Sequence, residues 1–328
     1  MLLDPFNRRL NYLRISLTDR CNLRCIYCMP EDGVPKLAHE DILSYEELLR
    51  LARLVVGLGI EKIRLTGGEP LVRKNVSALI KNLKEIPGVR DISLTTNGVL
   101  LAEQAQALWD SGVKRINVSL DTLEPEKYFR ITRFDLFHQV WAGIQEAERI
   151  GFSPIKINIV ALKGINDDEI LAFGRLSMQK PYHIRFIEFM PVGQENGWQA
   201  DRFLSSEDVF NTLTTLGPLY PANGQGLDGP AKRMSFAGAR GEIGLISPIS
   251  DHFCPTCNRL RLTAEGKMRV CLFSEDETDL RSPLRSGASD KELEAVIREA
   301  ITHKPREHPL QTSPLPWKCQ RQMSKIGG

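Results

Sequence analysis

The chain has 328 residues, 42% of them hydrophobic and 26% charged, which is typical of a globular protein and excludes disordered, collagenous and coiled-coil architectures. The 43 Lys and Arg residues nearly balance the 41 Asp and Glu residues, and the resulting charge of +2 argues against nucleic-acid binding. The sequence shows neither a run of about eighteen apolar residues nor a signal peptide at its start, so we expect no membrane association and a cytoplasmic location.

Between Asn11 and Met190, six runs rich in β-branched residues alternate with amphipathic segments. The runs, each of which predicts a strand, are LNYLRISL, KIRLTGG, DISLTTNG, RINVSLD, IKINIVAL and HIRFIEFM. Helices are predicted from Tyr45, after a capping box of Ser44 and Glu47, and over residues 76–86, 102–111, 137–150 and 167–178. The repeated strand–helix units predict an α/β fold with a parallel sheet, either open or curled into part of a barrel.

The helical periodicity fades after Pro191. Residues 192–250 are rich in Gly, Pro, Asp and Asn, which predicts a looser C-terminal region that a metal centre could help to order. We therefore divide the chain into residues 1–191, a partial barrel with a short N-terminal arm, and residues 192–328, a region that covers one end of it.

Polar residues gather where the predicted strands end. A cysteine-rich loop follows the first strand, TGGEP the second and TTNG the third, while Ser119 and Asp121 end the fourth strand and Glu188 and Met190 end the sixth. In parallel α/β folds, ligands bind at the carboxyl ends of the strands. This edge of the sheet is therefore the predicted functional site.

Six of the seven cysteines form two groups, which in a chain of this size favours metal or redox chemistry over disulfides. The first group, Cys21, Cys25 and Cys28, has CxxxCxxC spacing and no obvious fourth ligand. Structural zinc takes four ligands, whereas an iron–sulfur cluster on three cysteines keeps one iron open. The first group therefore predicts a cluster with an open iron.

The second group is Cys254, Cys257 and Cys271. His252 lies two residues before the first of them, so a structural zinc site of three cysteines and one histidine is as well supported by the spacing as an iron–sulfur cluster. Cys319 stands alone, and an isolated cysteine is usually an inert thiol whose role the sequence does not reveal.

CxxxCxxC with Tyr27 before its third cysteine, followed by GGEP after the second strand, resembles the radical S-adenosylmethionine superfamily. LRISLTDRCNLRCIYCMP, IRLTGGEPLVR, FCPTCNRLRLTAEGKMRVCLF and the terminal MSKIGG resemble, more narrowly, its GTP 3′,8-cyclase family. The resemblance implies an incomplete (β/α)6 barrel, like that of triosephosphate isomerase and of the radical S-adenosylmethionine type, with a C-terminal α+β extension that carries a second cluster. It also implies two [4Fe-4S] clusters, with S-adenosylmethionine on the open iron of the first and GTP on that of the second.

The resemblance assigns roles to individual residues, with both cysteine groups as cluster ligands and His252 as a non-ligand. The implied S-adenosylmethionine contacts are Tyr27, Gly68, Ser119 and Met190. The implied GTP contacts, rich in cations as a triphosphate requires, are Arg14, Arg64, Thr95, Lys156, Arg185, Arg259, Leu260 and Arg261. The implied catalytic residues are Arg14, Arg259, Arg261, Gly327 and Gly328, of which the glycines belong to a tail that enters the site.

The implied activity is that of a lyase that cyclises GTP in the first step of molybdenum cofactor biosynthesis. A 5′-deoxyadenosyl radical abstracts the ribose 3′ hydrogen, and the C3′ radical attacks guanine C8. The implied partners are an electron donor such as flavodoxin or ferredoxin and a downstream cyclic pyranopterin monophosphate synthase, with the chain a monomer or homodimer. The alternatives are a radical enzyme acting on a peptide and a protein with two zinc sites, whereas the missing P-loop motif argues against phosphate transfer.

Overall fold

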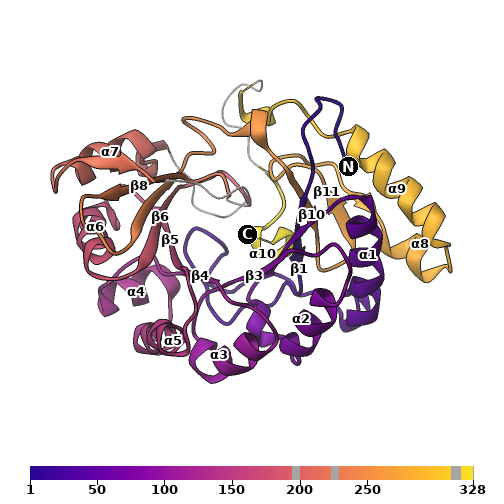
Figure 1. The fold of residues 1–328 in the computed structure, drawn as a ribbon, viewed down its shortest axis with the longest axis horizontal. Coiled ribbons are helices and arrows are strands. Elements are labelled where there is room, and N and C mark those ends of the chain that lie inside the picture. The colour runs from indigo at the N-terminus through magenta and orange to yellow at the C-terminus, as the bar shows by residue number, and fades with distance from the viewer. Residues whose placement is uncertain (194–199, 223–228, 312–318, 328) are drawn as a thin grey trace.

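A single twelve-stranded sheet organises the computed structural model, which describes residues 1–193, 200–222, 229–311 and 319–327. The strands follow the order β12-β11-β10-β1-β2-β3-β4-β5-β6-β9-β8-β7, and those from β10 to β9 run parallel. The first six are β1 (Tyr12–Ser16), β2 (Lys62–Thr66), β3 (Asp91–Thr96), β4 (Ile116–Ser119), β5 (Ile155–Ala161) and β6 (Tyr182–Glu188). Because β12 and β7 stay unpaired with each other, the sheet curls without closing (Figure 1).

Helices cover the convex side of this sheet (Figure 1). They are α1 (Tyr45–Leu58), α2 (Val76–Lys84), α3 (Leu101–Asp110), α4 (Pro125–Thr132), α5 (Phe137–Ile150) and α6 (Ile170–Gln179). The predicted capping box is confirmed, since the Ser44 hydroxyl accepts from the Glu47 N–H at 3.2 Å and the Glu47 carboxylate from the Ser44 N–H at 2.7 Å. The α/β partial barrel is thus confirmed, and among these six helices α4 is the one that the sequence patterns missed.

The prediction of a loose region over residues 192–250 is wrong for most of the part that the structure describes. It contains α7 (Ser206–Thr214), β7 (Leu219–Pro221), β8 (Lys232–Phe236) and β9 (Glu242–Ile246). A capping box of Ser205 and Asp208 begins α7. Glycine and proline mark the turns here, but short strands pairing with an existing sheet edge need little periodicity of their own.

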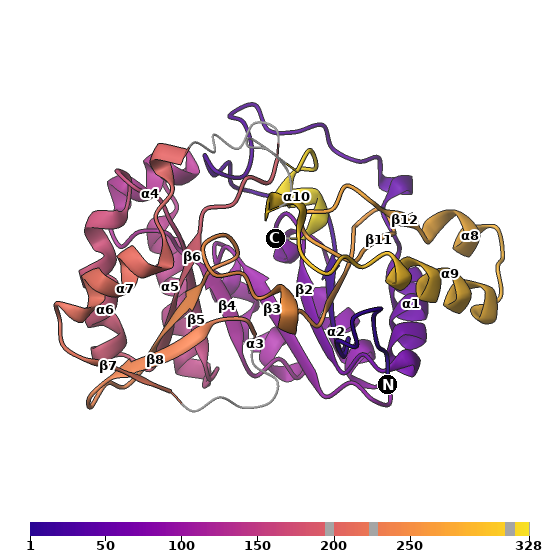
Figure 2. The same cartoon turned by 90° about the horizontal axis from the view of Figure 1, so that it is seen from above.

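The C-terminal half of the chain extends the barrel at both edges. β9 pairs with β6 at one edge, and β10 (Arg259–Leu262) pairs with β1 at the other. Beyond β10 lie β11 (Lys267–Arg269), β12 (Thr278–Asp279), α8 (Arg281–Arg285), α9 (Asp290–Thr302) and α10 (Met323–Ile326). Figure 2 shows α8 and α9 beyond the β12 edge and α10 near the middle of the molecule. The sheet is therefore continuous across residue 191, and the division there stays a prediction.

The strands alternate between two kinds of side chain. Leu13, Ile15, Ile63, Leu65 and Leu94 are at most 1% exposed and belong to the main hydrophobic core. The residues between them on the same strands are mostly polar and point to the other face of the sheet. The interior of a purely structural barrel is filled by apolar side chains. The polar inner face of this barrel therefore indicates a ligand site. In the described residues no helix is long and apolar enough to cross a bilayer.

Candidate active site

The first cysteine group lies in the loop after β1. Met29 and Cys28 donate their N–H groups to the Cys25 carbonyl at 3.1 and 2.9 Å, which folds the loop into a tight turn. The Leu23 N–H and the Asn97 amide point at the Cys21 sulfur, at 3.4 and 3.7 Å. Burial raises the pKa of the Cys21 thiol to about 11 and that of Cys28 to about 12. Buried thiols with N–H donors aimed at them are suited to holding a positively charged metal group.

Two cysteines of the second group, Cys254 and Cys257, lie on the connection from β9 to β10. Cys254 begins a short 3-10 turn (Cys254–Thr256), and Cys271 follows β11. Burial tends to raise the pKa of Cys257, but the neighbouring Lys304 and Arg259 outweigh it and lower that pKa below its ordinary value. Lys304 is 3% exposed and lies 3.6 Å from the Cys257 sulfur. Both cysteine groups line one cavity.

Sulfur spacing distinguishes a cluster from a single metal ion. Four ligands on one zinc ion lie about 3.8 Å apart for sulfur–sulfur pairs. Within the described chain, the one group of ligand atoms compact enough for a single ion is His252, Cys254 and His308, with its atoms inside 4.8 Å. His252 therefore does not join the three cysteines of the second group in a tetrahedron. Neither cysteine triad is among such compact groups in the described residues, so each suits a cluster better than a single ion.

A belt of cations lines the inner face of the sheet. Arg14 of β1 pairs in register with Arg64 of β2 on one side and Arg261 of β10 on the other. Arg259 pairs with Tyr12, two residues before Arg14. These side chains share one face because alternate residues of a strand point the same way. The cavity lining contains Arg14, Arg64, Arg259, Arg261 and also Arg185.

The opposite wall of the barrel continues the belt. Asn158 of β5 pairs with Ser119 of β4 and with Arg185 of β6. Gly244 of β9 pairs with Arg185, and a Cβ there would stand 3.1 Å from the Cγ atom of Arg185. The glycine leaves room for this buried arginine, whose exposure is 3%.

The pKa values show that burial first, and the neighbouring positive charges second, make these cations unfavourable. Burial, followed by the charge of Arg185, lowers the pKa of Lys156 to about 6, and burial lowers that of Lys62 to about 8. Burial tends to raise the pKa of Tyr12, but Arg64 and Arg14 outweigh it and lower the value to about 8. So many buried positive charges are unfavourable by themselves. A polyanionic ligand such as a triphosphate would relieve the repulsion.

All four predicted S-adenosylmethionine contacts also line the cavity, namely Tyr27, Gly68, Ser119 and Met190. The Tyr27 hydroxyl donates to Asp121 at 2.7 Å, and Asp121 also accepts from the Val160 N–H at 2.8 Å. Gly68 has an additional packing reason, because a Cβ there would stand 2.4 Å from the Arg20 carbonyl oxygen. The GGEP loop after β2 therefore packs directly against the start of the cysteine loop.

The C-terminal tail reaches into the same site. Arg261 donates from Nη1 to the Gly327 carbonyl at 2.6 Å. Gly327 has φ +74, and a Cβ on it would lie 2.5 Å from the Thr66 hydroxyl oxygen. Both facts explain a glycine at this position. Gly328, the other predicted catalytic glycine, lies outside the described residues.

The remaining predicted contacts occupy different positions. Thr95 lines the cavity, and its buried hydroxyl has no hydrogen-bond partner in the described part of the protein. Lys156 and Leu260 are buried but are not among the lining residues. Leu260 alternates with the two arginines of β10 and so faces the core, which leaves only its backbone to meet a ligand.

Sequence reasoning missed several residues of the site. Tyr12 lines the cavity, and Lys62 is buried on the same face of the sheet without being a lining residue. They lie two positions before Arg14 and Arg64, and this period-two alternation would have found them. Lys304 carried no such signal, since the turn after α9 brings it to Cys257 only in the folded chain.

Known proteins match the chain over nearly its whole length. The radical SAM superfamily model matches residues 15–176, and the Molybdenum Cofactor Synthesis C model matches residues 182–310. GTP 3′,8-cyclase of Thermodesulfovibrio yellowstonii is 51% identical over 327 residues, 99% of each chain, and that of Moorella thermoacetica is 49% identical over 325 residues, again 99% of each. The chain belongs to the GTP 3′,8-cyclase family.

The family carries two [4Fe-4S] clusters and S-adenosylmethionine as cofactors, which agrees with the two cysteine groups on one cavity. The fold is also that of Streptococcus suis SuiB bound to precursor peptide SuiA. That structure has a TM-score of 0.61 and 13% identity, with 98% of this chain and 77% of that chain covered. The predicted radical S-adenosylmethionine type of barrel, with an extension for a second cluster, is confirmed.

Proposed function

We propose that this chain converts GTP into (8S)-3′,8-cyclo-7,8-dihydroguanosine 5′-triphosphate, the first step of molybdenum cofactor biosynthesis. The observation that carries the proposal is one cavity lined by two cysteine triads and by arginines from β1, β2, β6 and β10. The family assignment supports the same reaction. It favours a nucleotide over the peptide substrate that the sequence left open.

The first triad, Cys21, Cys25 and Cys28, would hold one cluster, and Cys254, Cys257 and Cys271 the other. When bound and reduced, the first cluster supplies the electron that cleaves S-adenosylmethionine and yields a 5′-deoxyadenosyl radical. Tyr27, Gly68, Ser119 and Met190 would orient S-adenosylmethionine, which their shared position on the cavity wall supports.

The belt of cations would bind the triphosphate. Arg64 and Arg185, which line the cavity, would neutralise much of its charge of about −4, since guanidinium groups form paired hydrogen bonds with phosphate oxygens. Lys156, buried behind the lining residues, would add a further positive charge. The unpartnered hydroxyl of Thr95 and the Leu260 backbone would meet other parts of the nucleotide. Fixing the triphosphate end places the ribose, so the ribose 3′ hydrogen is held where it is removed.

Arg14, Arg259 and Arg261 would act at the reacting end of the nucleotide, with the tail residues Gly327 and Gly328. The hydrogen bond from Arg261 to the Gly327 carbonyl supports this role for the tail. Ile326 of the tail packs in one apolar cluster with Val192 and Phe273, which would keep water and competing hydrogen donors out of the site.

The proposal includes partners and a location that rest on the family. A one-electron donor such as flavodoxin or ferredoxin would reduce the first cluster, and cyclic pyranopterin monophosphate synthase would take the product. The enzyme would act in the cytoplasm as a monomer or homodimer.

The test is an assay of oxygen-free, reconstituted protein with S-adenosylmethionine, dithionite and GTP. We expect about eight irons per chain, one 5′-deoxyadenosine released per cyclised nucleotide, and at least about a hundredfold weaker binding of guanosine, which lacks the phosphates. Arg64→Ala should weaken GTP binding, whereas the exposed Arg298→Ala should not. Deoxyadenosine release that does not depend on GTP, or two bound zinc ions in place of iron, would refute the proposal.

A further inference from the structure

The described end of the chain, residues 319–327, is docked at its start against the barrel. Cys319 forms a parallel β-bridge with Val192, with the Gly193 N–H donating to the Cys319 carbonyl at 2.8 Å and the Cys319 N–H to the Pro191 carbonyl at 3.0 Å. Cys319 is fully buried beside Phe273. The tail therefore begins next to the loop that follows β6 and carries Met190.

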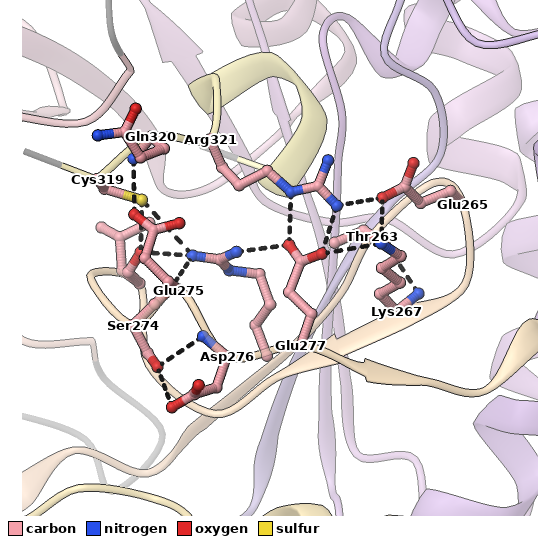
Figure 3. A network of polar contacts seen from close by, with 12 residues as sticks. Thr263, Glu265, Lys267, Ser274, Glu275, Asp276, Glu277, Cys319, Gln320 and Arg321 are labelled. Carbon is pink, nitrogen blue, oxygen red and sulfur yellow. Dashed lines mark hydrogen bonds and ion pairs between the residues drawn. The ribbon is translucent and has the colours of Figure 1, made fainter.

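An ion-pair clamp holds the next residues of the tail (Figure 3). Arg321 donates to the Glu277 carboxylate at 2.8 Å and also contacts Glu265 and the second Glu277 oxygen. Glu277 and Glu265 expose only 9% and 12% of their side chains, so water competes little for this pair. The Gln320 N–H donates to Glu275 at 2.7 Å.

The clamp shares a strand pair with the active site. Arg269 of β11 is fully buried and donates to Glu277 at 2.5 Å and toward the Cys319 sulfur at 3.6 Å. Arg269 also pairs in antiparallel register with Arg261 of β10. Directly opposed residues of such a pair point to one face, so this two-stranded unit grips the tail at both ends.

Between those two grips, the tail touches both halves of the site. Burial raises the pKa of the Cys28 thiol in the first triad, and the Ser324 backbone beside it acts in the opposite direction. The Gly327 carbonyl accepts a hydrogen bond from Arg261, near the second triad. Only Gln322 and the single turn α10 (Met323–Ile326) separate Arg321 from Gly327, so the position of Arg321 limits where Gly327 can lie.

We propose that Arg321 is a positioning residue whose clamp on Glu265 and Glu277 sets the register of the tail, so that Ser324 reaches Cys28 and Gly327 reaches Arg261. This inference rests on the proposed function only for its catalytic consequence. Substitution of Arg321 leaves Glu277 paired with Arg269 and Lys267, so no buried carboxylate is stranded.

The first test measures hydrogen exchange of the reconstituted holoenzyme. In Arg321→Ala the amides of residues 322–327 should exchange about tenfold faster or more, with iron content and melting temperature retained. Arg321→Lys should recover only part of the protection, because an ammonium group lacks the fork that bridges two carboxylates. The matched control is Arg298→Ala, which breaks an exposed pair with Glu294 on α9. Unchanged exchange in Arg321→Ala would overturn the proposal.

The second test asks whether Arg321 acts through the glycine end. Arg321→Ala should reduce kcat about tenfold or more with little change in KM, and removal of Gly327 and Gly328 should reduce it further. In the truncated chain, Arg321→Ala should cause no additional loss. If Arg321→Ala reduced kcat by the same factor in the full-length and the truncated chain, the proposal would be overturned. If the wild-type enzyme released no deoxyadenosine in response to GTP, the proposed function would be refuted instead. The hydrogen-exchange experiment would still show whether Arg321 positions the tail.

Discussion

Replacing Lys156 with Met should make the ligand-free protein more stable while impairing the binding of a triphosphate. Lys156 is 5% exposed, and burial together with Arg185 lowers its pKa from 10.5 to about 6. At pH 7 the folded chain therefore keeps this lysine mostly neutral, whereas the unfolded chain protonates it. The unfolded state binds more protons between pH 6 and 10.5, so the group reduces stability most near pH 6 and less as the pH rises.

The size of this effect follows from the distance between the working pH and the unfolded pKa. Each pH unit is worth about 1.36 kcal/mol, so the roughly 3.5 units between pH 7 and the unfolded pKa of 10.5 give a destabilisation of about 5 kcal/mol. A methionine of similar length removes this term. With about 1.5 °C per kcal/mol for a chain of this length, Lys156→Met should melt about 5 to 7 °C higher at pH 7.

Melting of the reconstituted protein at pH 7 and pH 9, with and without GTP, tests this reasoning. The difference between Lys156→Met and wild type should shrink at pH 9, and GTP should raise the melting temperature of wild type more than that of the variant. Calorimetry in buffers of different ionisation heat should show wild type taking up close to one proton per GTP at pH 8, because the triphosphate restores the charge. Lys291→Met, an exposed position on α9, is the control. A variant that melts lower than wild type at pH 7, or an unchanged pH dependence, would refute the reasoning.

Three further changes probe the two metal centres. Gly68→Ala should prevent the first cluster from assembling, seen as a loss of about four irons, because the new Cβ would stand 2.4 Å from the Arg20 carbonyl oxygen. Lys304→Met should shift the reduction potential of the second cluster downward in a spectroscopic titration, since the cation beside Cys257 favours added negative charge. Cys254→Ser should leave about four irons and an intact first-cluster signal, and zinc in wild-type protein at this site would contradict the assignment.

The strands of the barrel could be predicted because each is a short run of apolar and polar residues in alternation, ended by glycine or a polar turn. The same alternation also concealed polar residues on the inner face of the sheet. Arg14 and Arg64 were found by their motifs, whereas Lys62 was passed over, although its strand register places it on the same face. Helix α4 was missed because its sequence, PEKYFRIT, is short and carries no side-chain cap.

Contacts that depend on long-range folding left no local signal. Lys304 meets Cys257 and Arg269 meets Cys319 only because the C-terminal strands dock on the β1 edge of the sheet. The sequence also could not exclude zinc at the second triad. His252 lies near Cys254 in the chain, but folding brings His308, from 54 residues further on, into that group in place of the other cysteines.

The pairing of β1 with β10 constrains the order of events on the ribosome. Tyr12 and its partner Arg259 are separated by 247 positions, so β1 has an open edge for most of translation. Contacts of such separation form late and slowly. The first triad, Cys21, Cys25 and Cys28, is complete early in translation, whereas the second is complete only once Cys271 has been added. We therefore expect maturation to be sequential, with a half-loaded species along the way.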